Sequence, residues 1–428
     1  MRIAMLTNNY KPFVGGVPIS VERQAKELAK LGHQVTVFAP EYKDISQEYD
    51  EYRQEHVIRY RTSRRRMENG MVYPRLICKE ILEAFETEEF DCIHVHHPMF
   101  VGPMALYLGK KYDLPVIYTY HTKYEDYLHY IRPFENVGER SAARRSIYRL
   151  GKEKVVPGYM KWFTNQCDLI LAPTASMQEA MRQGGTKTPT AVFPTGLEDS
   201  FYIRDDQKAA ALREKYLQGR KHLFCTVSRL EEEKNPKFLL RGIARLKERM
   251  EESFRLLYIG EGSMREELEK MAAELGIAEE VIFAGNIENT EIKHYLNASE
   301  LFLFASKSET QGIVLAEAFA AGCPVVAVKA TGVEDIVISG TNGYMTEEDI
   351  EQWTGKVLAA LEEDQYKRLK QQAEITASGF RSSGLAVYEE LLYAQCISKR
   401  EEEGREYENE TNWAENLSAS IYRLFKAS

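Results

Sequence analysis

Two glutamates stand eight positions apart in a mostly apolar part of the chain. Glu309 lies in a polar loop, and Glu317 lies within the apolar segment 312–321, which has helical spacing and stops at Gly322. A carboxylate in a short buried helix is costly unless hydrogen bonds satisfy it. Glu317 therefore requires either an internal Lys or Arg partner, or a ligand whose hydroxyl groups donate to it, such as the 2′,3′-diol of a ribose.

The start of the same predicted helix is a second polar feature. The backbone N–H groups of Gly312, Ile313 and Val314 have no partners within the helix and point beyond its end, where the helix dipole attracts an anion. Glu309 precedes them closely in the sequence. We therefore expect an anionic group of a ligand to approach this helix start beside the Glu309 carboxylate.

Two cations stand near another predicted helix start. Arg229 follows the strand-like run 222–228, and Lys234 precedes a helix that begins at Pro236. Two positive charges beside a helix N-terminus suit a diphosphate. Ordinary surface charges are the alternative, because exposed Lys and Arg residues are usually just solvated.

These features together resemble the retaining family-4 glycosyltransferases. The resemblance rests on Glu309 and Glu317, which are separated by seven residues and followed by the AxGxPVVA pattern of residues 320–327. It rests also on the pair Arg229 and Lys234, which has the R(x4)K spacing of the family. The two glutamates alone would be weak evidence, but their flanking residues make the match specific.

Two further motifs extend the resemblance over the chain to about residue 392. The GEG of residues 260–262 is similar to the GxG that follows a strand in the family. The PTGL of residues 194–197 also matches, although Glu198 stands where aspartate is usual. The resemblance implies an α/β fold with two Rossmann-like, doubly wound domains that face each other across a cleft (GT-B type).

The resemblance also implies roles for the matching residues. Arg229 and Lys234 would bind the diphosphate of a UDP-sugar, and Glu317 would bind its ribose. Glu309, as a catalytic residue, would bind hydroxyls of the sugar. The family places a loop of small residues beside the donor where this chain has Gly16, although a glycine pair in a loop is equally compatible with a simple turn. The implied donor-binding set is Gly16, Arg229, Lys234, Gly312, Ile313, Val314 and Glu317.

The implied chemistry is front-face transfer with retention, in which the departing phosphate deprotonates the acceptor hydroxyl. Leaving-group charge would be neutralised by the two cations and the helix start, so that oxocarbenium character can develop at the sugar. This type of site needs no divalent metal and no bound cofactor, with the UDP-sugar as donor substrate.

A histidine follows a third predicted strand. His121 comes directly after the run 116–120, at the C-terminal end of a strand, where ligands gather in open α/β sheets. A lone histidine is more often structural. The segment HTKYEDYLHYI, however, resembles the diacylglycerol glucosyltransferase branch of the family. That resemblance implies that His121 is catalytic and contacts the transferred sugar, and that Asp126 binds the acceptor.

Three histidines at positions 94, 96 and 97 suggest a metal site at first sight. Strand alternation places His97 on the face opposite His94 and His96, and no acidic or cysteine ligand accompanies them. We therefore expect no metal site here.

Composition bounds the class of protein. A chain of 428 residues with 44% hydrophobic and 28% charged residues suits two globular domains. Its six cysteines are scattered without a CxxC pair, which fits a reducing cytoplasm. We expect no signal peptide and no membrane-spanning helix, because the N-terminus soon becomes polar and no run of about 18 apolar residues occurs. A net charge of −9 argues against nucleic-acid binding.

Strand and helix patterns alternate through both halves of the chain, and the first βαβ unit lacks GxGxxG, which disfavours a dinucleotide dehydrogenase. We predict an acceptor- and membrane-facing domain at 1–197, a hinge or linker at 198–220, a nucleotide-sugar-binding domain at 221–385, and a C-terminal helix with an appendix at 386–428 that crosses back to the first domain.

One helical face of the appendix carries Trp413, Leu417, Ile421, Leu424 and Phe425. Docking of that face on the protein is favoured over membrane insertion, because its flanks are acidic.

Two stretches of the first half are strongly basic. Residues 56–80 and residues 139–161 each contain seven basic and two acidic side chains, a local charge of +5. A solvated surface is one interpretation. The other is an anionic lipid surface, with Arg64, Arg65 and Arg66 over the headgroups and apolar neighbours at the interface.

The sequence thus favours a retaining glycosyltransferase that moves a hexose, glucose before others, from a UDP-sugar to a lipid acceptor, foremost 1,2-diacylglycerol. It would work in the cytoplasm at the inner face of the cell membrane. Two alternatives stay open. One is a retaining UDP-sugar transferase with a soluble acceptor, and the other is a non-catalytic sugar-nucleotide-binding scaffold of the same fold.

Overall fold

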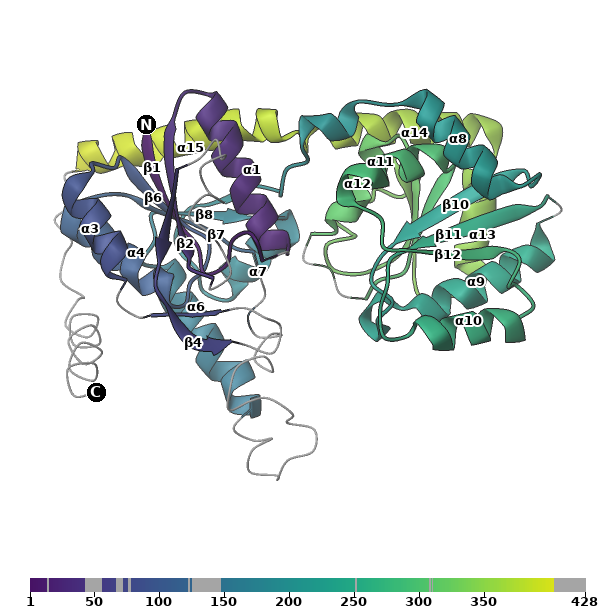
Figure 1. The fold of residues 1–428 in the computed structure, drawn as a ribbon, viewed down its shortest axis with the longest axis horizontal. Coiled ribbons are helices and arrows are strands. Elements are labelled where there is room, and N and C mark those ends of the chain that lie inside the picture. The colour runs from purple at the N-terminus through teal and green to yellow at the C-terminus, as the bar shows by residue number, and fades with distance from the viewer. Residues whose placement is uncertain are drawn as a thin grey trace.

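The structure, a computed structural model, describes residues 1–13, 15–42, 56–66, 72–75, 78–121, 124, 148–250, 252–307, 309 and 311–403. They form two α/β bodies side by side, with one long helix reaching from the second body along the first (Figure 1). Asp126, the appendix residues 404–428 and the side chains of Arg64, Arg65 and Arg66 lie outside this description.

The first body is built on a parallel sheet of seven strands. These are β1 (Arg2–Leu6), β2 (Gln34–Pro40), β3 (His56–Tyr60), β6 (Cys92–Val95), β7 (Val116–Thr119), β8 (Leu169–Ala172) and β9 (Thr190–Val192). Their order is β3-β2-β1-β6-β7-β8-β9. The order reverses between β1 and β6, so the loops that follow these two strands diverge and leave the crevice in which open α/β sheets bind ligands.

Helices cover both faces of this sheet. They are α1 (Gly16–Lys30), α3 (Lys79–Thr87), α4 (Val101–Tyr112), α6 (Val156–Thr164) and α7 (Ala175–Gln183). Successive strand residues point to opposite faces, so Ile117 and Tyr118 of β7 join two different apolar cores. Apart from the sheet, β4 (Thr62–Arg66) and β5 (Val72–Pro74) form a two-stranded antiparallel ribbon.

The second body repeats this plan. Its parallel strands are β10 (His222–Val227), β11 (Phe254–Ile259), β12 (Val281–Gly285), β13 (Leu301–Phe304), β14 (Val325–Val328) and β15 (Gly343–Thr346), in the order β12-β11-β10-β13-β14-β15. The order reverses between β10 and β13. Its helices are α9 (Pro236–Arg249), α10 (Arg265–Glu274), α11 (Asn289–Ala298), α12 (Ile313–Ala320), α13 (Ile350–Ala360) and α14 (Glu363–Ser378). The predicted pair of doubly wound α/β sheets is therefore confirmed.

The stretch 198–220, which we expected to be a hinge or linker, is instead largely helical. After a short 3₁₀ turn at Asp199–Tyr202, α8 (Asp206–Leu217) packs against α11 of the second body. Ala209 is buried in that core, and Leu212 and Tyr216 pack against it. The many charged residues between these apolar positions concealed the helical pattern in the sequence.

The long helix α15 (Ser382–Glu403) leaves the second body and packs on α1 of the first (Figure 1). Its residues Leu392 and Tyr393 belong to a core of the first body. Near its end, Arg400 binds Asp113 and Asp168, each at 3.0 Å. The helix thus fastens the two bodies to each other through both apolar packing and ion pairs.

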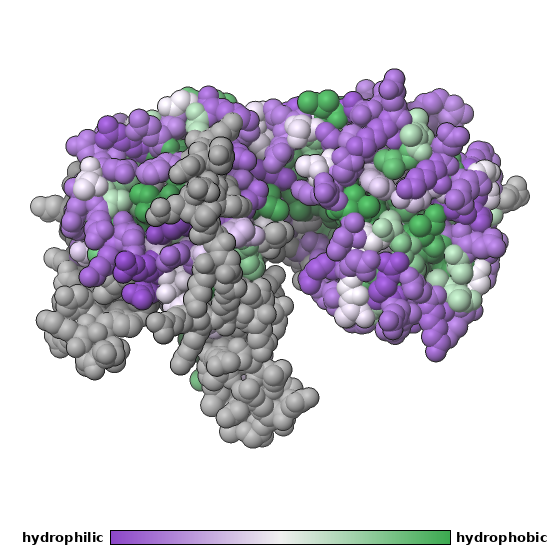
Figure 2. Space-filling view, in the orientation of Figure 1, coloured by the Kyte–Doolittle hydropathy of each residue, from purple (hydrophilic) through white to green (hydrophobic). Residues whose placement is uncertain are grey.

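The outer surface is mainly hydrophilic, while hydrophobic residues are visible in the hollow between the two bodies (Figure 2). Among the described residues, no helix has the length and apolar character that a bilayer crossing requires.

Candidate active site

The loops after β10 and β11 approach each other closely and support the first candidate residues. At Gly260, with a φ of +135°, a Cβ atom would lie 2.1 Å from the carbonyl oxygen of Ser228. At Gly262 it would lie 2.4 Å from the carbonyl oxygen of Leu230. Only glycine allows this contact, which holds the backbone on either side of Arg229 in place.

Lys234 and Glu309 form an ion pair between the loops that follow β10 and β13. The Nζ atom of Lys234 lies 2.6 Å from Oε1 of Glu309, and both side chains are largely buried. These strands are adjacent, so the two loops meet at the point where the strand order reverses. Two of the residues predicted from separate motifs therefore touch.

Arg229 differs from Lys234 in its surroundings. Its side chain is 69% exposed and binds Glu233, four positions along the chain, at 2.8 Å. Asn235, with a φ of +53°, turns the chain after Lys234 so that α9 can begin at Pro236. The two cations and the N-terminus of α9 thus lie within one short segment, as the sequence predicted.

The helix α12 begins directly after a glycine with a left-handed backbone conformation. Gly312 has a φ of +68°, which L side chains rarely adopt, and the N–H groups of Ile313 and Val314 follow it at the helix start. Gln311 reaches the first body, where its side chain accepts from the Thr195 N–H at 2.8 Å and donates to the Thr195 carbonyl at 3.3 Å. This helix start therefore faces the junction of the two bodies.

Glu317 is buried in α12, with 7% of its surface exposed. Within the described residues its carboxylate has neither a hydrogen bond nor an ion-pair partner. Burial raises the pKa of Glu317 to about 7, and the charge of Arg23 opposes the rise. Among the described residues, no Lys or Arg side chain lies at contact distance from this carboxylate, so the internal partner considered from the sequence is not found there. The carboxylate is therefore available to a ligand.

Arg23 escaped the sequence analysis. It lies on α1, is 7% exposed, and donates from Nη1 to the carbonyl of Gly196 at 2.8 Å. Its Nε atom lies 3.6 Å from Glu198. Gly16, at the start of the same helix, has no atom within 4 Å of where a Cβ would stand, so packing gives no steric reason for glycine there. Nothing in the sequence around Arg23 signals its place at the junction.

His121 follows β7 and contacts a second histidine. Its Nε2 lies 3.0 Å from Nδ1 of His96, and the two rings stack with centroids 5.2 Å apart. Burial and the nearby histidines 97 and 94 lower the pKa of His121 well below its ordinary value, so the ring is neutral at pH 7. Within the described residues, no group of three or more His, Cys, Asp or Glu side chains is arranged for a metal ion.

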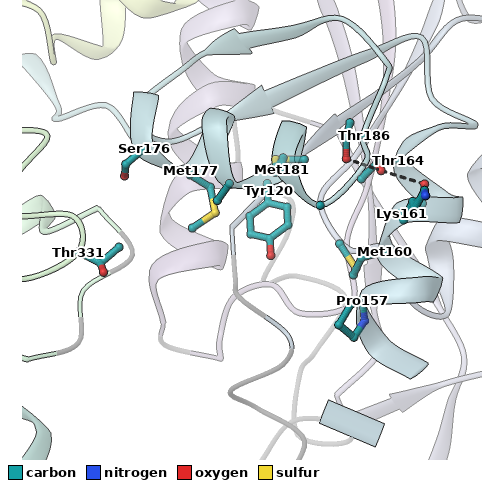
Figure 3. A pocket seen from close by; sticks show the side chains of 12 residues that line it. Tyr120, Pro157, Met160, Lys161, Thr164, Ser176, Met177, Met181, Thr186 and Thr331 are labelled. Atoms are coloured by element: carbon teal, nitrogen blue, oxygen red, sulfur yellow. Dashed lines mark hydrogen bonds between the residues drawn. The ribbon is translucent and has the colours of Figure 1, made fainter. Parts of the chain in front are cut away.

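A pocket of about 360 Å³ lies between α6 and α7, and its lining includes Tyr120, the residue before this histidine. Met160, Met177 and Tyr120 project into it from the first body, and Thr331 stands across from them on the second (Figure 3). Ser176, at its rim, binds Asp335 of the second body through its hydroxyl at 2.5 Å. The pocket thus combines three methionines with polar residues such as Lys161 and Thr186, and it opens at the junction of the bodies.

Comparison with known proteins supplies the family. The family model described as Glycosyltransferase Family 4 matches residues 14–201, and the model described as Glycosyl transferases group 1 matches residues 208–376. The chain is 29% identical over 375 residues to the alpha-monoglucosyldiacylglycerol synthase of Streptococcus pneumoniae, covering 84% of this chain and 78% of that protein. It is 24% identical over 412 residues to the alpha-monoglucosyldiacylglycerol synthase of Acholeplasma laidlawii, covering 93% and 98%.

Among solved structures, the chain is similar to Anabaena HepE in complex with UDP. The TM-score is 0.70 with 18% identity, covering 92% of this chain and all of that one. The two family models lie on the two parallel sheets, one on each body, and together span most of the chain. The sequence resemblance is thereby confirmed, and this chain is a glycosyltransferase of family 4 with the two-domain GT-B fold.

Proposed function

We propose that this glycosyltransferase transfers glucose from UDP-glucose to 1,2-diacylglycerol with retention, forming α-monoglucosyldiacylglycerol. One observation carries the proposal: two relatives from different organisms, one of them matched over 98% of its length, are both named alpha-monoglucosyldiacylglycerol synthase. The UDP bound by Anabaena HepE supports a UDP-sugar as donor. In this proposal the enzyme works at the anionic inner face of the cell membrane, as a peripheral protein.

On the donor side, the diphosphate would bind Arg229, Lys234 and the N–H groups at the start of α12. These groups neutralise the leaving group as the bond to the sugar breaks. Lys234 is paired with Glu309 in the structure. A diphosphate that binds Lys234 would replace Glu309 as the partner of the ammonium group. The Glu309 carboxylate could then accept hydrogen bonds from sugar hydroxyls.

On the acceptor side, the pocket lined by methionines supports a lipid. Tyr120, which lines this pocket, is the residue before His121. We propose that His121 contacts the transferred sugar. Methionine side chains adapt to flexible apolar ligands. An acyl-glycerol placed in this pocket would direct its free hydroxyl toward the junction of the bodies. Asp126 stays a proposed acceptor-binding residue.

The direct test is a transfer assay with either UDP-glucose or UDP-galactose over anionic liposomes that contain diacylglycerol. Mass spectrometry of the lipids identifies the product, and proton NMR of the anomeric position reports its configuration. We expect a monohexosyl lipid of α configuration from UDP-glucose. Liposomes without diacylglycerol are the control.

Two other results would replace the proposal. Transfer to a water-soluble acceptor with none to diacylglycerol favours the soluble-acceptor alternative. Calorimetric binding of UDP without transfer to any acceptor favours a scaffold. A β-configured product would contradict retention.

A pH dependence of donor binding follows from Glu317. If the ribose hydroxyls donate to an ionised Glu317, UDP binding lowers the pKa of about 7 and releases protons. UDP affinity should then rise with pH, by about tenfold between pH 6 and pH 8, because only about a tenth of the carboxyls are ionised at pH 6. Calorimetry in two buffers of different ionisation enthalpy measures the released protons.

The matched control for this prediction is Glu317→Gln, which keeps the shape and removes the titration. Its UDP affinity should be lower and should retain only the weak pH dependence of the nucleotide itself. If the variant shows the pH profile of the wild type, Glu317 does not bind the ribose. Loss of thermal stability with unchanged UDP affinity would make the carboxylate purely structural.

A further inference from the structure

A chain of buried polar side chains runs through the first body toward His121. It begins on α15, where Glu389 and Tyr393 stand one turn apart and are both fully buried. The Tyr393 hydroxyl donates to Oε1 of Glu389 at 2.7 Å. The same hydroxyl oxygen lies 2.6 Å from Nδ1 of His94. A helix that comes from the second body thus contacts the middle of the first sheet by polar groups.

The chain continues across the sheet to His121. His94, in β6, is fully buried, and its Nε2 lies 2.6 Å from the hydroxyl of Thr119 in β7. Its ring packs on the ring of His96 with centroids 4.1 Å apart. His96 then reaches His121 through the 3.0 Å contact between Nδ1 and Nε2. The ring of His121 is therefore positioned by His96, and the ring of His96 in turn packs against His94, which is fixed by its own hydrogen bonds.

The hydrogen-bond directions at His94 follow from counting protons. Tyr393 has one hydroxyl proton, which it gives to Glu389, so its oxygen accepts the Nδ1–H of His94. If Nδ1 carries the only ring proton of His94, Nε2 accepts the hydroxyl proton of Thr119. Nδ1 of His94 also lies 3.4 Å from Oε1 of Glu389, so the same ring nitrogen faces both the tyrosine and the glutamate.

The direction at His96 follows from its other nitrogen. Nε2 of His96 is buried and has no hydrogen-bond partner among the described residues. If His121 donated to His96, the proton of a neutral His96 would sit on Nε2 as a buried, unpaired N–H, which native proteins rarely contain. His96 therefore donates its Nδ1–H to Nε2 of His121. Burial lowers the pKa of both rings well below the ordinary value, which keeps them neutral.

The remaining oxygen of Glu389 is accounted for by a small cavity between α1 and α15. The cavity, of about 10 Å³, is lined by Glu389, Arg23, Gln24 and Ser382. Each of these side chains has a buried atom without a hydrogen-bond partner in the described part of the chain: Oε2, Nε, Oε1 and Oγ, respectively. That volume holds about one water molecule, which would bond several of these atoms.

We propose that His96, His94, Tyr393 and Glu389 are positioning residues that hold the His121 ring with its proton on Nδ1, as a hydrogen-bond donor to an oxygen of the transferred hexose. The proposal rests on the proposed function in that it places the sugar at His121. The four residues do not touch the substrate. His96 fixes the tautomer of the ring through its hydrogen bond, and Tyr393 and Glu389 hold His94, against which the His96 ring packs. Outer partners of functional histidines commonly have such a role.

The first test compares two tyrosines. Tyr393→Phe removes the hydroxyl that connects Glu389 to His94, and we expect kcat for glycolipid synthesis to fall by about tenfold with KM for UDP-glucose little changed. Tyr118→Phe is the matched control, because Tyr118 is also fully buried in the first body and its hydroxyl has no hydrogen-bond partner in the described residues. Equal kcat values in the two variants would remove Tyr393 from the proposal.

The second test uses two replacements of His96. His96→Asn can still donate an N–H toward His121, whereas His96→Leu cannot. We expect the leucine variant to lose kcat by about tenfold or more and the asparagine variant to recover most of it. A loss of the same size in both, with unchanged thermal stability, would contradict a role through the donated hydrogen bond.

The decisive readout needs no substrate. Nitrogen-15 NMR of histidine-labelled protein reports which ring nitrogen carries the proton. The signals of His121 are identified as those that disappear in the spectrum of His121→Asn. We expect Nδ1 protonated in the wild type and a mixture of tautomers in His96→Leu. A wild-type proton on Nε2 would overturn the assignment even if Tyr393→Phe failed to fold. The expected tautomer together with no glycolipid product would instead reject the proposed function alone.

Discussion

Changing Lys234 to alanine is expected to weaken UDP binding by about ten- to a hundredfold, since a charge-assisted contact to phosphate contributes about 1.5–3 kcal/mol. Arg229→Ala should have an effect in the same range, because the exposed guanidinium is free to turn from Glu233 to a diphosphate. Turnover should fall with affinity in both variants, since the same charges stabilise the leaving group. Calorimetric titration with UDP measures the affinity.

Lys237→Ala is the matched control for these variants. Lys237 lies in the first turn of α9, three positions after Lys234, and pairs with Glu267 at 2.8 Å, whereas Lys234 pairs with Glu309. Its removal should leave UDP affinity unchanged. If Lys234→Ala lowers thermal stability and keeps full UDP affinity, the pair with Glu309 is structural and the diphosphate assignment fails.

Glu309→Gln separates the two partners of that ion pair. Without its carboxylate, Lys234 no longer has to leave a charged neighbour when UDP binds, so UDP affinity should stay the same or rise. Glucose transfer should nevertheless fall, because the group that accepts from the sugar hydroxyls is weakened. A parallel loss of UDP affinity and transfer would place Glu309 with the diphosphate site rather than with the sugar.

Changing Arg64, Arg65 and Arg66 together to serine is expected to lower partitioning onto anionic liposomes by about a hundredfold. Each basic residue at such a surface contributes about 1 kcal/mol, so three contribute about 3 kcal/mol. UDP affinity should not change, and activity on dispersed short-chain diacylglycerol should survive, because the patch would only concentrate the enzyme at its substrate. Liposome sedimentation measures the partitioning.

The backbone of these three arginines lies in the β4–β5 ribbon, apart from both main sheets (Figure 1). A control with the same loss of charge is Arg245, Lys247 and Arg249 to glutamine, on α9 of the second body, where each pairs with a glutamate. Binding should also weaken as salt rises, because exposed charges are screened within about 10 Å at ordinary ionic strength.

Equal sedimentation of the arginine variant and the wild type would exclude this patch and direct attention to residues 139–161. If neither basic stretch affects sedimentation, the alternative of a soluble acceptor becomes the better one. The two outcomes differ from a loss of UDP affinity, which would indicate damage to the fold.

The local pattern of the sequence was sufficient for the two parallel sheets and for the segments that carry the donor candidates. Strands buried on both faces are continuous apolar runs, and glycine and proline mark where helices start and stop, so Arg229, Lys234, Glu309 and Gly312 were found at strand ends and helix starts. The local pattern did not reveal the helix at residues 206–217, because many charged residues separate the few apolar positions of α8.

Only the tertiary structure decided which of these groups meet. Lys234 and Glu309 are 75 residues apart, and His94 and Tyr393 are 299 apart. Their contacts depend on strand order and on the path of α15 across the first body, which is set by the packing of many apolar side chains at once. The sequence determined by itself which chemistry the residues offer. The Lys234–Glu309 ion pair, the lack of a partner for Glu317 among the described residues, and the contacts behind His121 required the fold, because burial and proton sharing depend on neighbours that are distant in the sequence.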